Sequence, residues 1–232
     1  MNLNADFSKR VLVHAADLPW VPSPTAGVDR RMLDRIGDEV ARATSIVRYA
    51  PNSAFPAHTH GGGEEFLVLE GVFEDESGAF PAGSYVRNPP QSRHTPGSTP
   101  GCTIFVKLWQ FDPDDRAFVR LDTASVPYQP VSGTPGVWSK TLFEGGTETV
   151  RMQRWAPNTP VRWSDIAGGA EVLVLAGDFE ESGERFNRLS WLRLPTGATL
   201  DAIAGPDGAE VWVKTGHLSA ASLMPPQRGN GA

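Results

Sequence analysis

Four side chains in the first half of the sequence could together hold a divalent metal ion. His58 and His60 are separated by one residue, which places both imidazoles on one face of an extended strand. Three glycines follow and allow a sharp reversal, so that Glu64, at the start of an apolar run, can return beside the histidines. His94 follows a second short strand-like segment, and three of the five histidines of the chain thus belong to this set. Imidazole nitrogens and carboxylate oxygens are ligands of zinc, iron, manganese and nickel, so the sequence predicts a metal site.

Composition excludes several classes of function. The 232 residues carry a net charge of −6, whereas nucleic-acid binding depends on clustered lysine and arginine, so we expect no nucleic-acid partner. The N-terminal segment has no apolar core or cleavage signal, and no apolar run approaches the roughly 20 residues that span a bilayer. We therefore expect a cytoplasmic protein without membrane association. The single cysteine, Cys102, excludes an internal disulfide and a cysteine-rich zinc module.

Sequence patterning predicts an all-β fold. The 24 glycines and 20 prolines suit short strands joined by many turns. Residues 64–69 are apolar on both faces after the first two positions, which is typical of a strand covered on both sides. Cys102, Ile104 and Val106 share one face of a later strand, which predicts an inert core thiol at Cys102. Residues 32–47 could form a helix, but the turn-like sequence Ile36-Gly-Asp-Glu39 favours a hairpin.

The chain contains two copies of one pattern, and this sets the number of domains. Arg48-Tyr-Ala-Pro-Asn52 recurs 106 residues later as Arg154-Trp-Ala-Pro-Asn158. At the same offset, Glu65-Phe-Leu-Val-Leu-Glu-Gly71 recurs as Glu171-Val-Leu-Val-Leu-Ala-Gly177. The period is too long for a solenoid repeat and suits two copies of a small β domain.

The two predicted domains differ in their capacity to bind metal. We predict a metal-binding barrel over residues 1–115 and a degenerate barrel over residues 116–232, with residues 224–232 as a loose tail. The second-copy positions that correspond to the four candidate ligands carry residues that are not metal ligands: Ser164, Ile166, Ala170 and Leu200. We therefore expect one metal ion per chain, in the first half.

The ligand pattern resembles that of the cupin superfamily. The first cupin motif is matched by His58, His60, Glu64 and Gly71, and the second by Gly83, Pro89 and His94. Three motif positions differ in this chain: Asn52, Gln91 and Ser98. These differences affect the predicted turn geometry and leave the predicted metal ligands unchanged. The resemblance implies two tandem cupin (jelly-roll) β-barrels, with a metal ion in the first.

The resemblance also implies which of two adjacent glutamates binds the metal. Glu64 has the cupin spacing to the following glycine, so Glu65 is expected to point to the opposite face, toward an arginine such as Arg93 or Arg87. The residues that flank the second motif could line a pocket mouth or be ordinary strand and turn residues: Tyr85, Arg87, Asn88 and Gln91. The histidines outside the motifs are predicted to be surface or interface residues: His14 and His217.

More narrowly, the first half of the chain resembles the cupin domain of ChrR-type anti-sigma factors, in residues 58–71 and in residues 85–90 before His94. In that family a zinc ion sits in the cupin domain, which is needed for the response to singlet oxygen and related oxidants. The resemblance therefore implies one zinc ion here. The family binds its sigma factor through a separate N-terminal helical zinc domain built on histidine and cysteine. This sequence shows no such segment and only Cys102, so we expect no sigma-factor binding by that route.

Two functions of different classes remain open. The first is a metal-containing sensor or small-molecule-binding protein linked to oxidative stress, with four protein ligands closing a zinc site. The second is a metal-dependent dioxygenase that acts on a small dicarbonyl or phenolic ketone. Small cupin dioxygenases such as acetylacetone dioxygenase look similar and hold iron with histidines alone, and mixed histidine and carboxylate ligands also suit iron, manganese or nickel. An isomerase or lyase is a third, weaker alternative. The sequence shows no general base distinct from the ligands, which favours the first function. By analogy with other cupins we also expect a homodimer.

Overall fold

The computed structural model describes residues 1–38 and 40–218, and these residues form an almost purely β structure. Within them, the only helical elements are two single turns of 3-10 helix, η1 (Ala15–Asp17) and η2 (Thr123–Ser125). The predicted tail, residues 224–232, lies outside the described residues. The prediction of an all-β fold is confirmed.

The described chain forms two compact units. The first contains Met1–Ala5 and Pro19–Ala124, and the second contains Asp6–Leu18 and the residues from 125 to 218. Two tandem barrels are therefore confirmed as the architecture. The domain boundary between residues 115 and 116 stays a prediction. A short segment before it, Asp6–Leu18, belongs to the second unit, and a short segment after it, residues 116–124, belongs to the first.

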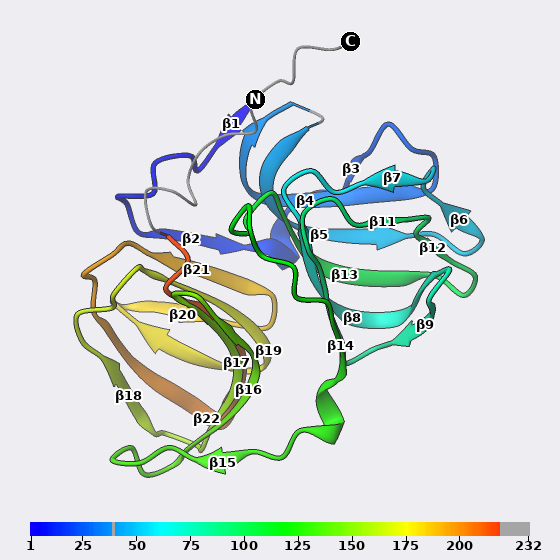
Figure 1. Ribbon diagram of the computed structural model, residues 1–232. Coiled ribbons are helices and arrows are strands. Elements are labelled where there is room, and N and C mark those ends of the chain that lie inside the picture. The colour runs from blue at the N-terminus through cyan, green and yellow to red at the C-terminus, as the bar shows by residue number, and fades with distance from the viewer. Residues whose placement is uncertain (39, 219–232) are drawn as a thin grey trace. The chain divides into compact units, whose positions relative to one another are not determined.

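A continuous ladder of strands forms the first unit, in the order β1-β4-β5-β13-β8-β10-β14 (Figure 1). Its strands are β1 (Asn2–Leu3), β4 (Val28–Gly37), β5 (Ala41–Tyr49), β13 (Cys102–Leu108), β8 (Glu64–Asp75), β10 (Ser84–Asn88) and β14 (Val119–Asp122). The shorter strands around it are β3 (Val21–Pro22), β6 (Ser53–Ala54), β7 (His58–Thr59), β9 (Gly78–Pro81), β11 (Arg93–His94) and β12 (Gly97–Ser98). All these pairings are antiparallel.

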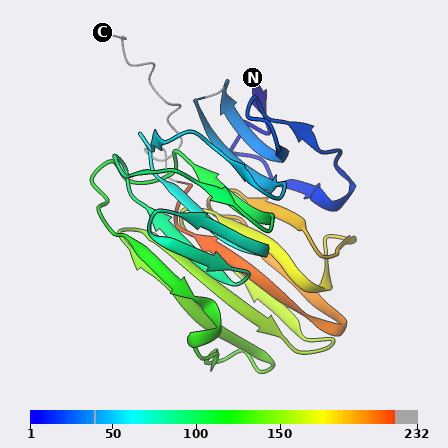
Figure 2. The same cartoon turned by 90° about the vertical axis from the view of Figure 1, so that its right-hand side faces the viewer.

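The second unit repeats this ladder in the order β15-β16-β17-β22-β19-β21-β2. Its strands are β15 (Gln129–Pro130), β16 (Val137–Gly145), β17 (Glu148–Trp155), β22 (Leu200–Thr215), β19 (Ala170–Glu181), β21 (Ser190–Leu194) and β2 (Val11–His14), with β18 (Pro160–Trp163) on β22 and β20 (Glu184–Phe186) on β19. The long strands β19 and β22 run side by side (Figure 2). The repeat found in the sequence is therefore a repeat of strand order.

The last strand of each ladder comes from the other half of the sequence. β14, which follows the first repeat, pairs with β10 and completes the first ladder. β2, which precedes the first repeat, pairs with β21 and completes the second ladder (Figure 1). A turn of 3-10 helix follows each of these strands, which marks them as equivalent elements of the two repeats.

Local sequence explains the hairpins that open each ladder. β4 and β5 pair along almost their whole length, so the strands on either side of the predicted turn form a hairpin and not a helix. Glu39, in the predicted turn, lies outside the described residues. The turn between β16 and β17 carries Gly146 with a φ of +58°, a conformation that glycine adopts at little cost. The core of the first unit includes Phe66, Phe73 and Ile104, all at most 2 % exposed.

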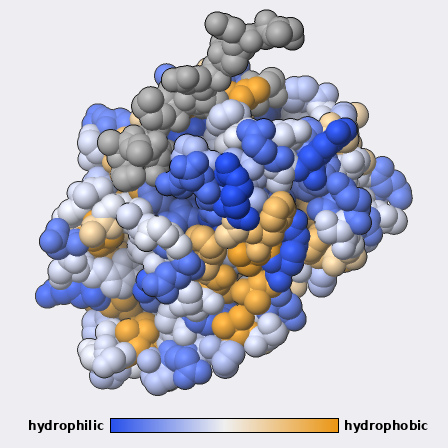
Figure 3. All heavy atoms as spheres, viewed as in Figure 1, coloured by the Kyte–Doolittle hydropathy of each residue, from blue (hydrophilic) through white to orange (hydrophobic). Residues whose placement is uncertain are grey.

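Surface hydrophobic residues are scattered over both units. The large exposed ones are Met1, Val21, Val40, Phe118, Trp138 and Ile203. Figure 3 shows that hydrophilic residues predominate on the face in view, with some hydrophobic residues among them. No helix in the described part of the chain has the length and apolar character required to cross a bilayer.

A pair of equivalent glycines, one in each unit, is required by a close approach of backbones. Gly71 and Gly177, at equivalent positions, have φ values of +71° and +65°, and a Cβ at either would collide with a backbone carbonyl oxygen, that of Gly101 or Gly208. Gly133 has a similar φ of +75° but open space around it.

We expect Gly71→Ala and Gly177→Ala each to lower the free energy of unfolding by about 2–5 kcal/mol, because left-handed strain and overpacking add. Gly133→Ala should cost only the strain, about 1–2 kcal/mol. Urea unfolding of the three variants measures the difference. Equal losses in all three would show that the carbonyl contact does not matter.

Cys102 is a buried thiol in the core of the first unit, with 4 % of its surface exposed. Burial raises the pKa of Cys102 to about 11, although a hydrogen bond with Ser98 opposes this. A thiol in an unfolded chain has a pKa near ~8.5. At pH 8 the folded protein therefore contains far less of the reactive Cys102 thiolate than the unfolded protein does.

Iodoacetamide should therefore alkylate Cys102 at least about 100-fold more slowly in the folded protein than in urea at pH 8, and the folded rate should rise with pH until about pH 11. Mass spectrometry of timed samples measures both rates. Rapid alkylation without denaturant would contradict the core assignment.

Candidate metal centre

Strand pairing brings the histidines together. In the short ladder of β7 and β11, His58 lies directly opposite His94. His60 follows β7, where its N–H donates to the carbonyl of Ser92 at 2.9 Å and its own carbonyl accepts from the N–H of Gln91 at 2.8 Å. These bonds hold the chain after β7 against the chain before β11, so that His60 lies beside the His58–His94 pair.

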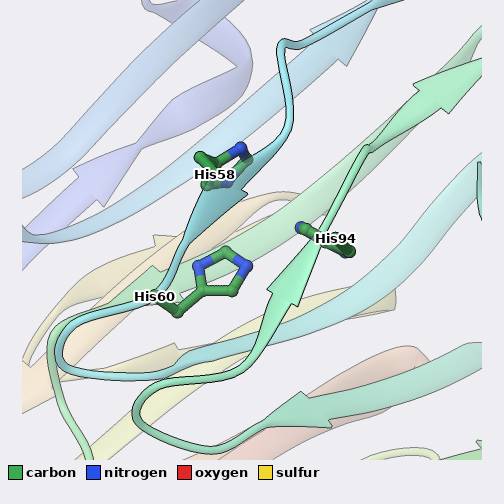
Figure 4. Close-up of side chains that lie close together, drawn as sticks. All are labelled: His58, His60 and His94. Carbon is green, nitrogen blue, oxygen red and sulfur yellow. The ribbon is translucent and has the colours of Figure 1, made fainter.

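The three imidazoles form one group that could hold a metal ion. One ring nitrogen from each of His58, His60 and His94 lies within 4.8 Å of the others. The ring centroids are 4.7 to 5.3 Å apart, and the three side chains lie close together (Figure 4). His60 and His94 are buried, whereas His58 is half-buried and thus the most accessible of the three.

Glu64, the first residue of β8, lies beside this group. Its side chain is buried, and its Oε2 atom is 3.4 Å from Nε2 of His60 and 3.4 Å from Nε2 of His94. Two atoms that each lie about 2.1 Å from a tetrahedral ion are about 3.4 Å apart, so these separations fit joint coordination. Asn88 donates a hydrogen bond to the same oxygen at 2.9 Å.

Hydrogen bonds to the other ring nitrogens leave the Nε2 atoms available. Nδ1 of His58 lies 2.9 Å from the carbonyl oxygen of Pro56, and Nδ1 of His94 lies 3.1 Å from Oδ2 of Asp75. Both acceptors favour the tautomer with the proton on Nδ1 and the lone pair on Nε2. The buried Nε2 atoms of His60 and His94 have no hydrogen-bond partner. Buried lone pairs without donors fit a metal ion.

The electrostatics of the group shift the pKa values of His60 and Glu64 toward the forms that bind metals. Burial lowers the pKa of His60, against the opposing charge of Glu64. Burial alone would raise the pKa of Glu64, but His60, His94 and the hydrogen bond from Asn88 together lower it. The neutral imidazole of His60 and the carboxylate of Glu64, the forms that bind metals, are therefore the favoured states of these two side chains.

The glycines between His60 and Glu64 serve mainly to admit an aromatic ring. Only Gly63 has a positive φ, +78°, so the expected reversal depends on unusual backbone angles at one position. A Cβ on Gly61 would lie 2.6 Å from the ring of Trp109, and one on Gly62 would lie 2.5 Å from it. The loop that links two candidate ligands is thus packed flat against Trp109.

Aromatic rings border the group on one side. Phe55 lies 6.1 Å from the ring of His58, and Phe73 lies 6.0 Å from the ring of His94. Tyr49 contacts both phenylalanines at 5.9 Å, edge to face. Burial, followed by the charge of Glu64, raises the pKa of Tyr49 well above its usual range, so its hydroxyl stays protonated.

Glu65 lies on the opposite face of β8 from Glu64. It is buried, accepts a 2.6 Å hydrogen bond from the Tyr85 hydroxyl and lies 3.5 Å from Arg87. Tyr85 and Arg87 therefore face away from the metal centre. Of the residues proposed for a pocket mouth, Asn88 contacts a candidate ligand through its side chain and Gln91 through its backbone N–H.

The prediction for His217 was wrong. This residue is 2 % exposed, and its Nε2 lies 2.9 Å from Oε1 of Glu171. Glu171 is the counterpart of Glu65, so a buried acid on this face of the sheet finds a polar partner in each unit. His14 is half-buried, with Nδ1 2.9 Å from the hydroxyl of Ser190.

The second unit fills the equivalent space with apolar side chains. Ile166, Ala170 and Leu200 are buried members of its core cluster, and Ser164 is exposed. Trp163 pairs with Leu200 where His58 pairs with His94 in the first unit. The expectation that this unit binds no metal stays a prediction.

Comparison with known protein families agrees with this geometry. The family model described as the ChrR cupin-like domain matches twice, over residues 8–112 and 116–219. The chain belongs to the ChrR cupin-like family. No curated protein sequence matches the chain significantly.

Solved cupin structures share the fold at low sequence identity. A candidate dioxygenase from Nostoc punctiforme is 16% identical with a TM-score of 0.74, over 97% of this chain and 88% of that one. A candidate glyoxylate-induced protein from Pseudomonas aeruginosa is 13% identical, with a TM-score of 0.70 over 89% and 87% of the chains. The bacterial pirin YhhW from Escherichia coli, in complex with nickel(II), is 15% identical, with a TM-score of 0.64 over 90% and 99%. These likenesses confirm the two-barrel cupin fold.

The packing of the glycine loop can be tested by a double-mutant cycle. Gly61→Ala should lower the free energy of unfolding by about 1–3 kcal/mol, because the atoms nearest to its added Cβ belong to the Trp109 ring. In a Trp109→Ala background the same substitution should cost markedly less. Denaturant unfolding of the four proteins gives the coupling energy, which we expect to reach about 1 kcal/mol or more. Strict additivity would refute the contact.

Proposed function

We propose that this protein binds one divalent metal ion through His58, His60, Glu64 and His94. The observation that carries the proposal is the position of Glu64 Oε2, 3.4 Å from two buried Nε2 atoms that lack other partners. In the absence of an ion, a buried carboxylate facing buried lone pairs would be an unfavourable arrangement. A divalent ion supplies the positive charge that both groups lack.

Zinc, in a sensing or small-molecule-binding protein linked to oxidative stress, is the assignment we favour. Three imidazoles and one carboxylate complete a four-coordinate zinc site, and such closed sites stabilise structure and leave little room for substrate. The separations of the ligand atoms fit a tetrahedral ion, and membership of the ChrR cupin-like family supports the sensing role. In this role the residues of the chain hold the ion and exclude water from it, and the ion ties β7, β8 and β11 together.

One observation favours a dioxygenase as the second candidate. The half-buried His58 lies beside Phe55, and the rings of Tyr49 and Phe73 continue this aromatic border. Such a border would suit a small dicarbonyl or phenolic ketone, because apolar walls with few polar groups are typical of small-molecule sites. An octahedral iron, manganese or nickel ion held by four protein atoms would keep two further positions.

Elemental analysis of protein purified without added metal or chelating resin separates the candidates. About one zinc per chain that resists mild chelation would support the sensing or binding role. Iron, manganese or nickel at that stoichiometry would support the dioxygenase and justify an oxygen-consumption screen with small diketones. Less than a tenth of an equivalent, together with no uptake of added metals, would refute the proposal.

His94→Ala should lower metal affinity at least about 100-fold, since it removes one of four ligands. His14→Ala is the matched control, because it removes a half-buried histidine whose hydrogen bond is to Ser190 in the second unit. Competition with a chelator of known affinity measures both. Full metal content in the His94 variant would contradict the ligand assignment.

A further inference from the structure

A chain of hydrogen bonds runs from Glu64 to a strand supplied by the second half of the sequence. Asn88 Nδ2 donates to Glu64 Oε2 at 2.9 Å, and Asn88 Oδ1 accepts from Nη2 of Arg120 at 2.6 Å. Arg120 lies on β14 and pairs with Val86 of β10. The three side chains thus span three adjacent strands, β8, β10 and β14.

We infer that Asn88 and Arg120 are positioning residues that hold the Glu64 carboxylate in place as a metal ligand. This inference rests on the proposed function. Its geometric basis is that the nitrogen and the oxygen of the Asn88 amide each form a hydrogen bond whose direction cannot be reversed. The carboxylate oxygen can only accept and the guanidinium can only donate, so the amide cannot turn over without losing both bonds.

Arg120 is itself held in place at several points. Its Nη1 donates to the carbonyl oxygens of Arg87 and Val119, each at 2.9 Å. Its guanidinium lies 5.7 Å from the rings of Phe80 and Phe118. A planar donor group anchored in this way loses little further entropy when it orients Asn88.

The bond from Asn88 leaves Glu64 able to bind an ion. A carboxylate oxygen has two lone pairs. One lone pair of Oε2 accepts the amide N–H, and the other remains for the space between His60 and His94, whose Nε2 atoms lie 3.4 Å away. Asn88 thus fixes which oxygen faces the histidines.

The second unit provides an internal control for this role. β2 pairs with β21 as β14 pairs with β10, so strand pairing is the same in both units. The register places three apolar residues where the first unit has Glu64, Asn88 and Arg120: Ala170, Leu194 and Leu12. These side chains pack in or against the apolar core. The polar chain is therefore not needed to attach the last strand, and it occurs in the unit that has the histidines.

The test replaces each residue by its counterpart in the second unit. We expect Asn88→Leu and Arg120→Leu to weaken binding of Zn²⁺ and Co²⁺ by about 10–100-fold, the usual effect of losing a group that orients a ligand. Arg120→Lys, which keeps one donor and the charge, should give an intermediate affinity. Arg162→Leu, which removes an exposed arginine paired with Asp201, is the matched control and should bind as the unaltered protein does.

Two readouts separate positioning from general stability. Competition with a chelator gives the affinity of the folded protein, and the visible spectrum of the Co²⁺ complex reports coordination. Thermal unfolding of the metal-free variants gives stability. A lower melting temperature with unchanged affinity and spectrum in both leucine variants would overturn the inference. If the buried Asn88→Leu does not fold, Arg120→Leu and its lysine rescue decide the question, because residue 120 is exposed.

Failure of the proposed function would look different from failure of this inference. If the unaltered protein takes up neither Zn²⁺ nor Co²⁺, or if His94→Ala binds as tightly as the unaltered protein, the metal site itself is refuted and the positioning role with it. If the unaltered protein binds, His94→Ala does not, and Asn88→Leu and Arg120→Leu bind normally, only the positioning role is wrong.

Discussion

The interior of the first barrel contains a carboxylate, and much of the arrangement around it follows from the cost of burying that charge. An ionised carboxylate taken out of water without partners is unfavourable by several kcal/mol or more. Glu64 meets this constraint with Asn88 on one side and the rings of His60 and His94 on the other. Because these partners lie on different strands, the registers of the β8–β10 and β7–β11 ladders must both be correct for the carboxylate to be stable inside.

The second barrel shows what the same backbone does without a carboxylate at the position equivalent to Glu64. Ala170, Leu194 and Leu200 occupy the equivalent positions and pack in the core. Features shared by both barrels, such as the close approach at Gly71 and Gly177, therefore belong to the fold itself. Features confined to the first barrel belong to its site. Internal duplication thus separates requirements of folding from requirements of chemistry within a single chain.

Sequence reasoning predicted the strands, the repeat and the histidine group, because these depend on short spacings and on local turn chemistry. It did not find the contact of Trp109 with Gly61, since that contact joins segments far apart in sequence. The positions of Asn88 and Arg120 depend on the register between three strands, which no local pattern specifies. His217 was misjudged because its burial depends on Glu171 in another strand.

The positions of β14 and β2 in the sequence affect how the two barrels can fold while the chain is being synthesised. β14 emerges shortly after β13, so the first barrel can close, with its histidines in place, while the second is still unmade. β2, by contrast, is synthesised long before the strand it pairs with, because His14 and its partner Ser190 are separated by 176 residues. At a synthesis rate of about 5–20 residues per second, β2 lacks its partner strand β21 for roughly 10–35 s. Unpaired strand edges promote aggregation, so during synthesis β2 is exposed to this risk for longer than the strands of the metal-binding barrel.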